Sequence, residues 1–187
     1  LIHCHGTDVR WGINWLQRKC LKRAKRVLVS TPDLLEILPD AIWLPNPIDM
    51  ERFKPLKEHS GNKVLYFSHW YENMTERLRE NCEKFGYNLT IPESILVPYE
   101  RFHLLLNEFD IFVDRLSLKS YSKTALEAMA CGLPVIGYMH NLEETLEKLT
   151  SLHERKNLVR GQNENIISKH KLEAVVERLI KIYEELF

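Results

Sequence analysis

The sequence predicts an α/β fold with a Rossmann-like, mainly parallel sheet, and a partial second Rossmann-like domain before it. Short β-rich runs alternate with amphipathic stretches, which is the pattern of βα units. Most of these runs are almost continuously apolar, as expected where helices cover both faces of a sheet. The strand candidates are Leu1–Cys4, Val27–Ser30, Ile42–Leu44, Val64–Ser68, Leu89–Ile91, Ile95–Val97, Ile111–Asp114 and Val135–Tyr138.

Helix signals lie between these strand candidates. Thr31 places a capping hydroxyl before Pro32, which predicts a helix over Asp33–Leu38. A second helix is expected over Thr75–Phe85, and Gly86 is suited to end it.

Two further helices are expected towards the C-terminus. Asn141 followed by Glu144 resembles a capping box, and it opens a segment with Leu142, Leu146 and Leu149 on one face. The last helix, about Lys171 to Phe187, has an apolar stripe that must dock on another element. That stripe consists of Leu172, Val175, Val176, Leu179, Tyr183 and Leu186.

The chain shows a boundary near its first third. Pro45 and Pro47 fix an extended turn, and the segment Lys57–Asn62 contains no apolar residue. A partial βαβ piece therefore precedes this linker, and a fuller α/β domain follows it. The first residues, Leu1–Gly6, read as the end of a buried strand without an initiator methionine, so we expect a piece of a longer protein.

Composition narrows the function classes. The 187 residues can form one large domain or two small ones, and 44% hydrophobic with 28% charged residues is ordinary for a soluble protein. The 26 basic and 26 acidic side chains give no net charge, which argues against nucleic acid as a partner. No apolar run approaches the roughly 20 residues of a membrane span. The four scattered cysteines favour a reduced, cytoplasmic setting.

The segment Ile111–Tyr138 carries the clearest chemistry. It reads as strand, short loop, helix Thr124–Ala130, turn and strand. The start of such a helix points unpaired backbone N–H groups outward at the carboxyl edge of the sheet, which suits a diphosphate. Small residues, Ser120 and Ser122, let the ligand approach.

Glu127 lies one turn inside this helix. Its carboxylate could accept hydrogen bonds from two ribose hydroxyls. The alternative is a well-capped helix with a solvated glutamate. The candidate donor-binding residues are Lys119, Ser120, Tyr121, Ser122, Lys123, Thr124 and Glu127, with Ser68 and His69 after an earlier strand.

Three ordered blocks resemble a known family. Leu126–Ile136 (LEAMACGLPVI) resembles the donor-site signature of retaining glycosyltransferases of the GT-B architecture. Val27–Pro32, followed by Trp43–Asp49 and Arg52–Pro55, resembles the interdomain linker of that family. His5–Asp8 (HGTD) resembles a segment late in its N-terminal domain.

The resemblance implies a domain plan and an activity. Residues 1–54 would be the end of the acceptor-side domain with the linker, and residues 55–170 the nucleotide-sugar domain. Residues 171–187 would be a helix that packs back on the N-terminal part. The implied activity is a metal-independent, retaining transfer of a hexose from a UDP- or GDP-sugar to a sugar, lipid-linked or protein acceptor. No cofactor is implied.

The resemblance also implies roles for the first block. His5 would line the catalytic cleft near the transferred sugar, and Asp8 would orient that loop or meet the acceptor. Ordinary strand-end hydrogen bonds, or a metal site shared by His3 and His5, remain alternatives for the histidines. Capping of the next segment remains the alternative for Asp8.

The sequence departs from the family pattern in two segments. Lys119 stands eight residues before Glu127, where the family has a sugar-binding glutamate, and an ammonium group accepts no hydrogen bonds. After the first strand of its donor domain, the family has an arginine and a lysine that neutralise the diphosphate. This chain has His69 and Met74 there, so one of the two positive charges is absent unless Arg77 supplies it. We therefore expect Lys123, with Lys119, to supply the missing positive charge. A catalytically silent nucleotide-sugar-binding module and a sugar-nucleotide epimerase are the alternatives to a transferase.

Other candidates allow two interpretations each. The run Arg18–Arg26 holds six basic residues and is either a solvated helix face or a peripheral contact with the inner face of a membrane. Asp114 either contacts the donor or caps the loop after its strand. Trp70 and Tyr71 either pack in the core or lie against the nucleobase.

Overall fold

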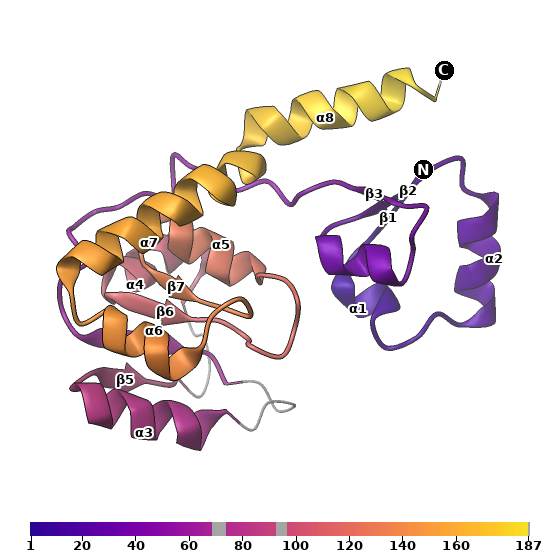
Figure 1. Cartoon of the computed structure of the whole chain (residues 1–187). Coiled ribbons are helices and arrows are strands. Elements are labelled where there is room, and N and C mark those ends of the chain that lie inside the picture. The colour runs from indigo at the N-terminus through magenta and orange to yellow at the C-terminus, as the bar shows by residue number, and fades with distance from the viewer. Residues whose placement is uncertain (69–73, 93–96, 187) are drawn as a thin grey trace. The chain divides into compact units, whose positions relative to one another are not determined.

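The chain forms two compact units, one of which is made from both ends of the sequence. The computed structural model describes residues 1–68, 74–92 and 97–186 (Figure 1). The first unit comprises Leu1–Pro47 with Lys169–Phe187, and the second comprises Ile48–Ser168. These divisions fall after residues 47 and 168, whereas the sequence placed them after residues 54 and 170.

The first unit is built on a three-stranded parallel sheet in the order β1-β2-β3. Its strands are β1 (Ile2–Cys4), β2 (Val27–Val29) and β3 (Ile42–Trp43). Successive residues of a strand point to opposite faces. Val29 therefore packs with Cys4, Val9 and Leu34 on one face, and its neighbour Leu28 packs on the other.

Helix α8 (Leu172–Glu184) covers that second face. Val175 and Ile182 are buried against Leu28 and Leu44, and Leu179 packs partly against them. Part of the predicted stripe lies on the side away from this contact. Its exposed members are Leu172, Val176 and Tyr183.

The remaining helices of the first unit are α1 (Gly6–Val9), α2 (Trp15–Arg23) and the 3₁₀ helix η1 (Pro32–Glu36). The predicted helix Asp33–Leu38 was therefore wrong in type and extent. Pro39 follows it directly, and a proline disfavours helical backbone in the residue before it. The tighter 3₁₀ turn still buries Leu34 completely.

The second unit contains a four-stranded parallel sheet in the order β5-β4-β6-β7. Its strands are β4 (Lys63–Tyr66), β5 (Asn88–Thr90), β6 (Ile111–Val113) and β7 (Val135–Ile136). One face buries Leu65 and Phe112, and the other buries Val64 and Ile111. The parallel α/β class expected from the sequence is thus confirmed. Residues 95 and 96 of the strand candidate Ile95–Val97 lie outside the described residues.

Helices flank this sheet on both faces. They are α3 (Thr75–Phe85), η2 (Tyr99–Arg101), α4 (Phe102–Asn107), α5 (Lys123–Ala130), α6 (Leu142–Lys148) and α7 (Leu152–Asn165), with η3 (Ile167–His170) at the end of the unit. Helix α3 ends at Gly86 as predicted, with φ of +74°. The Asn141 side chain accepts a hydrogen bond from the Glu144 N–H, which confirms the predicted start of α6.

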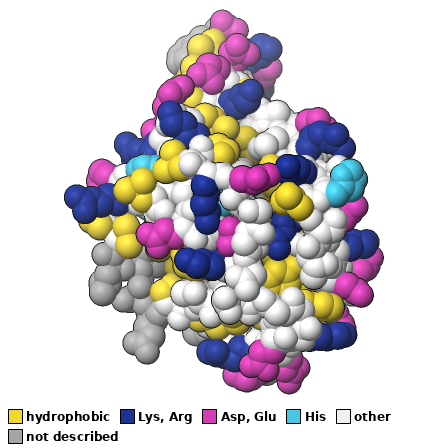
Figure 2. Space-filling model, turned by 90° about the vertical axis from the view of Figure 1, so that its left-hand side faces the viewer, with side chains coloured by type: hydrophobic (Ala, Val, Ile, Leu, Met, Phe, Trp, Pro, Cys, Tyr) yellow, Lys and Arg dark blue, Asp and Glu magenta, His cyan; other side chains and the backbone are white. Residues whose placement is uncertain are grey.

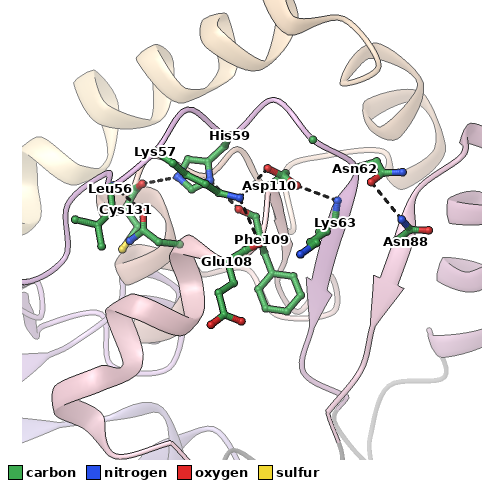
Figure 3. Close-up of polar contacts among 12 residues, drawn as sticks. Leu56, Lys57, His59, Asn62, Lys63, Asn88, Glu108, Phe109, Asp110 and Cys131 are labelled. Carbon is green, nitrogen blue, oxygen red and sulfur yellow. Dashed lines mark hydrogen bonds and ion pairs between the residues drawn. The ribbon is translucent and has the colours of Figure 1, made fainter.

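Polar contacts join the linker segment to the amino edge of this sheet (Figure 3). The ring nitrogens of His59 lie 2.7 Å from the carbonyl oxygen of Phe109 and 2.9 Å from that of Cys131. Asp110 accepts a hydrogen bond from the Lys63 N–H at 3.1 Å and pairs with the Lys57 ammonium at 3.2 Å. These contacts tie a segment without apolar residues to the strand ends.

Helix α7 is fixed in the same region. The buried Arg155 guanidinium donates to the carbonyl oxygens of Leu149, His59 and Gly61. The sequence did not predict this helix because its fully buried residues are polar, Arg155 and Gln162, rather than an apolar stripe.

Candidate functional site

A braced loop brings the chain from β6 into α5 at the carboxyl edge of the second sheet. The buried Asp114 follows β6 directly, and its Oδ2 accepts a hydrogen bond from the Ser122 N–H at 2.8 Å. Ser122 in turn caps α5, since its hydroxyl oxygen accepts from the Ala125 N–H at 3.0 Å. Burial raises the pKa of Asp114, and the hydrogen bonds from Ser122 oppose that rise. The structure therefore shows Asp114 holding the loop.

This cap leaves two donors at the start of α5. The N–H of Leu126 donates to the carbonyl oxygen of Ser122. The N–H groups of Lys123 and Thr124, by contrast, form no hydrogen bond with any residue that the structure describes. Such N–H groups carry the partial positive charge of a helix N-terminus and can bind an anion.

Glu127 lies inside the same helix and is only 2% exposed. Its Oε1 accepts a hydrogen bond from the Tyr99 hydroxyl at 2.7 Å. The Lys123 ammonium lies 3.6 Å from the same oxygen and 4.7 Å from the centroid of the Tyr99 ring. Three side chains therefore form one cluster, which combines a carboxylate, a phenol and a cation.

Burial dominates the electrostatics of this cluster. It raises the pKa of Glu127, while the Tyr99 hydrogen bond and the Lys123 charge act in the opposite direction. Burial and donation to Glu127 both raise the pKa of Tyr99. Burial alone would lower the pKa of Lys123, but its contacts with Tyr99 and Glu127 outweigh burial and raise it.

The second oxygen of Glu127 is differently placed. No residue that the structure describes donates a hydrogen bond to Oε2. Oε2 is also not one of the fully enclosed side-chain atoms that lack a partner, although Glu127 as a whole is only 2% exposed. Helix α5 thus carries, one turn from its start, a carboxylate oxygen whose acceptor capacity no described residue uses.

The other predicted donor-binding residues are distributed around this loop. Ser120 is buried and Lys119 is exposed. Thr124 is half-buried in the first turn of α5, and Ser68 is exposed after β4. The Tyr121 ring packs on Tyr138 at a centroid distance of 5.3 Å. Three of the residues considered above lie outside the described residues: His69, Trp70 and Tyr71.

Tyr99 was not among the residues predicted from sequence. It lies 28 positions before Glu127, in η2, and meets it only because β5 and β6 end at the same edge of the sheet. No local spacing or motif connects the two residues. Only the tertiary arrangement identifies Tyr99.

The candidate catalytic residues of the first unit lie after β1. Asp8 Oδ2 accepts a hydrogen bond from the His5 backbone N–H at 2.7 Å, which is a capping-box contact at the start of its own helix α1 and differs from the cap on the next segment considered for Asp8. The rings of His3 and His5 lie 4.7 Å apart. Burial, followed by the neighbouring His5, lowers the pKa of His3. Among the described residues, no group of three or more histidine, cysteine or acidic side chains is arranged to hold a metal ion.

The surface is consistent with the neutral composition. Basic and acidic side chains are interspersed over the face in Figure 2, and neither sign forms a continuous patch there. In the first unit, α2 has no buried residue, and Trp11, Trp15 and Leu16 are largely exposed. No helix among the described residues has the length and apolar character that a membrane crossing requires.

Comparisons with known proteins identify the fold. No protein-family model matches the sequence, and no curated protein matches it significantly. A structure of TarM superposes with a TM-score of 0.64 at 14% identity, over 92% of this chain and 47% of that one. A mutant of S. aureus TarM in complex with fondaparinux, α-GlcNAc-glycerol and UDP superposes with a TM-score of 0.62 at 14% identity, over the same shares of the two chains.

The third structure is sucrose-phosphate synthase from Thermosynechococcus elongatus. Its TM-score is 0.59 at 16% identity, over 92% of this chain and 61% of that one. The chain therefore has the fold of GT-B glycosyltransferases, as the sequence led us to expect. It spans about half the length of the TarM chains.

Proposed function

We propose that the unit Ile48–Ser168 binds the nucleoside diphosphate of a UDP- or GDP-sugar, and that the whole protein transfers the sugar to an acceptor. The observation that carries this proposal is the buried Glu127 carboxylate, whose Oε2 is open to a ligand beside the unpaired N–H groups of α5. A carboxylate and a helix N-terminus, one turn apart, match the ribose and the diphosphate of a nucleotide.

The sheet topology supports the same position. Strand β4 has β5 on one side and β6 on the other, so the chain reverses its direction of strand addition at β4. Ligands of open parallel α/β sheets bind at the carboxyl ends of the strands beside such a switch point. The loop Asp114–Ser122 and the exposed Ser68 follow the two strands that flank it.

In the proposed reaction, α5 stabilises the negative charge on the departing diphosphate. The N–H groups of Lys123 and Thr124 are fixed before binding, because the bond between Asp114 and Ser122 orders the loop. This electrostatic role needs neither a metal ion nor a cofactor. We further propose that the transfer retains the anomeric configuration, that His5 lines the cleft near the transferred sugar, and that Asp8 orients that loop or meets the acceptor, as the sequence resemblance implies.

The departures from the family pattern affect how the sugar is recognised and how the charge of the diphosphate is neutralised. Lys119 replaces the glutamate expected to hold the sugar, so we propose that other groups recognise it. Lys123 pairs with Glu127, and 53% of the Lys123 side chain is still accessible. We propose that Lys123, together with Lys119, adds positive charge at the mouth of the site.

Binding is tested by calorimetric titration of the 187-residue chain with UDP, GDP and their sugars. We expect saturable binding of one nucleotide, weakened about tenfold or more by Glu127→Gln, because a charge-assisted hydrogen bond to the ribose is lost. Glu147→Gln, an exposed glutamate of α6, is the control and should bind normally. Failure of both nucleotides to bind the unaltered chain would refute the proposal.

A catalytically silent nucleotide-sugar-binding module is the second candidate. The observation that favours it is Lys119 in place of the sugar-binding glutamate. Incubation with labelled UDP- and GDP-sugars and candidate acceptors separates the two functions, since only a transferase moves label to an acceptor. Conversion of the sugar nucleotide without an acceptor would instead indicate an epimerase.

The basic helix α2 favours a peripheral contact with an anionic membrane, such as the inner face of the cytoplasmic membrane. Six basic residues of the segment Arg18–Arg26 lie beside the exposed Trp15 and Leu16. Such a combination binds the interface of anionic bilayers. Cosedimentation with phosphatidylglycerol vesicles should be strong at low salt and weak at high salt. Equal binding to neutral phosphatidylcholine vesicles would argue against this role.

A further inference from the structure

Tyr99 is held in place on several sides. Its ring packs against Phe53 at a centroid distance of 5.8 Å. The Arg52 guanidinium lies 5.6 Å from the ring centroid, and the Lys123 ammonium lies 4.7 Å from it. Cations over an aromatic face are attracted by the ring quadrupole. These contacts orient the phenol before any ligand arrives, although 44% of Tyr99 is exposed.

The hydroxyl of this fixed ring is directed at the proposed ribose carboxylate. It donates to Glu127 Oε1 at 2.7 Å, which is a short distance typical of a bond to an ionised acceptor. The shortest distance from Lys123 Nζ to the carboxylate, 3.6 Å, also falls on Oε1. Both partners thus use one oxygen, and they leave Oε2 for a ligand.

We propose that Tyr99 is the positioning residue of the nucleotide site: it fixes the Glu127 carboxylate through Oε1, so that Oε2 accepts a hydrogen bond from a single ribose hydroxyl. This inference rests on the proposed nucleotide binding and makes it more specific. A glutamate with two available oxygens would recognise both ribose hydroxyls. A glutamate held by Tyr99 discriminates between them.

Burial of the Glu127 carboxylate has a free-energy cost, and this cost explains why a positioning group is needed. Glu127 is almost fully buried, so its charged form is disfavoured unless hydrogen bonds stabilise it. Tyr99 supplies one such bond in the absence of ligand. Removal of its hydroxyl would leave the carboxylate less well oriented and more easily protonated.

The test combines one substitution with nucleotide analogues. Tyr99→Phe keeps the ring, its packing on Phe53 and its cation contacts, and removes only the hydroxyl. UDP and GDP are titrated calorimetrically to find which one binds. The bound nucleotide and its 2′-deoxy and 3′-deoxy forms are then titrated into the unaltered chain and into Tyr99→Phe.

In the unaltered chain, we expect one deoxy analogue to bind about tenfold more weakly and the other to bind within about twofold of the parent nucleotide. In Tyr99→Phe, binding of the parent nucleotide should fall about three- to tenfold. Binding of the analogue that lacks the recognised hydroxyl should not change, because the group that Glu127 would hold is absent.

A purely structural role for Tyr99 gives a different result. The substitution would then weaken all three nucleotides equally, and the inference would be wrong. It would also be wrong if both deoxy analogues bind equally weakly to the unaltered chain, or if Tyr99→Phe binds the parent more tightly, which would make the hydroxyl a competitor of the ribose.

A matched control checks for loss of folding. Tyr87→Phe removes a buried hydroxyl that donates to the Leu146 carbonyl oxygen at 2.9 Å, away from the proposed site. It should lower the melting temperature without changing the preference among the nucleotides. If neither UDP nor GDP binds the unaltered chain, the proposed function fails and this inference fails with it. If a nucleotide binds but its two deoxy analogues do not show the expected difference in affinity, only the inference about Tyr99 is refuted.

Discussion

Both edges of the second sheet bury charged side chains, but the two edges differ in how far hydrogen bonds within the protein satisfy those charges. At the amino edge, Arg155 donates to three backbone carbonyl oxygens. Asp110 accepts from a backbone N–H and pairs with a lysine (Figure 3). At the carboxyl edge, one oxygen of Glu127 is held by Tyr99, and no described residue donates a hydrogen bond to the other.

This difference distinguishes a buried charge that stabilises the fold from a buried charge that is available to bind a ligand. Burial of a charged group is costly at either edge, and at the amino edge hydrogen bonds within the protein offset that cost. At the carboxyl edge the compensation is incomplete without a ligand. A buried charge alone is therefore weak support for a site, and unused hydrogen-bonding capacity next to it is the more specific signal.

The largest expected effect is at the amino edge. Arg155→Ala removes a guanidinium that serves three carbonyl oxygens, and we expect the free energy of unfolding to fall by about 3 kcal/mol. Urea unfolding monitored by circular dichroism measures this change. Nucleotide affinity under native conditions should stay the same. A loss of affinity without a loss of stability would contradict the structural role of this edge.

A pair of isosteric substitutions compares the two carboxylates directly. Asp110→Asn loses the charge that pairs with Lys57, and should lower the free energy of unfolding by about 1–2 kcal/mol. Glu127→Gln should change it by less than about 1 kcal/mol, because removal of a disfavoured buried charge offsets the weakened contacts. The comparison fails if Glu127→Gln is the more destabilising of the two.

The two carboxylates should also respond to pH with opposite signs. Burial would raise the pKa of Asp110, but hydrogen bonds from Lys63 and Lys57 outweigh it and hold that pKa below the ordinary 3.8. Its stabilisation is present above pH 3.8 and is lost as the pH falls through the lower folded value.

Glu127 has a pKa raised above the ordinary 4.5, chiefly by burial. Its folded form therefore binds a proton more readily, and its contribution to stability grows as the pH falls through that raised value. Nucleotide affinity should fall over the same range, because the carboxylate acceptor is lost. Titrations from pH 7 downwards measure this, and in Glu127→Gln the decline should be absent. Tyr99→Phe should move the decline to higher pH.

The smallest effect is expected on the surface next to Arg155. Lys156 pairs with Glu58 at 2.8 Å, but both side chains are mostly exposed. Exposed ion pairs contribute little to stability. Lys156→Ala should leave the melting temperature unchanged within error. A loss of stability as large as that of Arg155→Ala would show that the different exposure of Lys156 and Arg155 does not determine their contributions to stability.

Local signals in the sequence predicted much of the fold. Gly86 marks the end of α3, because glycine adopts the positive φ that this C-cap requires. Asn141 marks the start of α6 for the equally local reason that its side chain reaches an N–H three residues on. By contrast, α7 was missed, since its buried contacts are made by Arg155 and Gln162 and leave no apolar periodicity.

For the candidate site, the sequence by itself determined the helix that carries Glu127 and the capped loop before it, because caps and strand ends depend on neighbours along the chain. The tertiary structure decided what surrounds the carboxylate. Tyr99 reaches it from η2, the Asp114 carboxylate holds the loop before α5, and the Lys123 ammonium lies beside Glu127. The Tyr99 contact joins residues brought together by parallel strands that end at one edge, which no local pattern records, whereas Lys123 and Glu127 are only four residues apart on one helix.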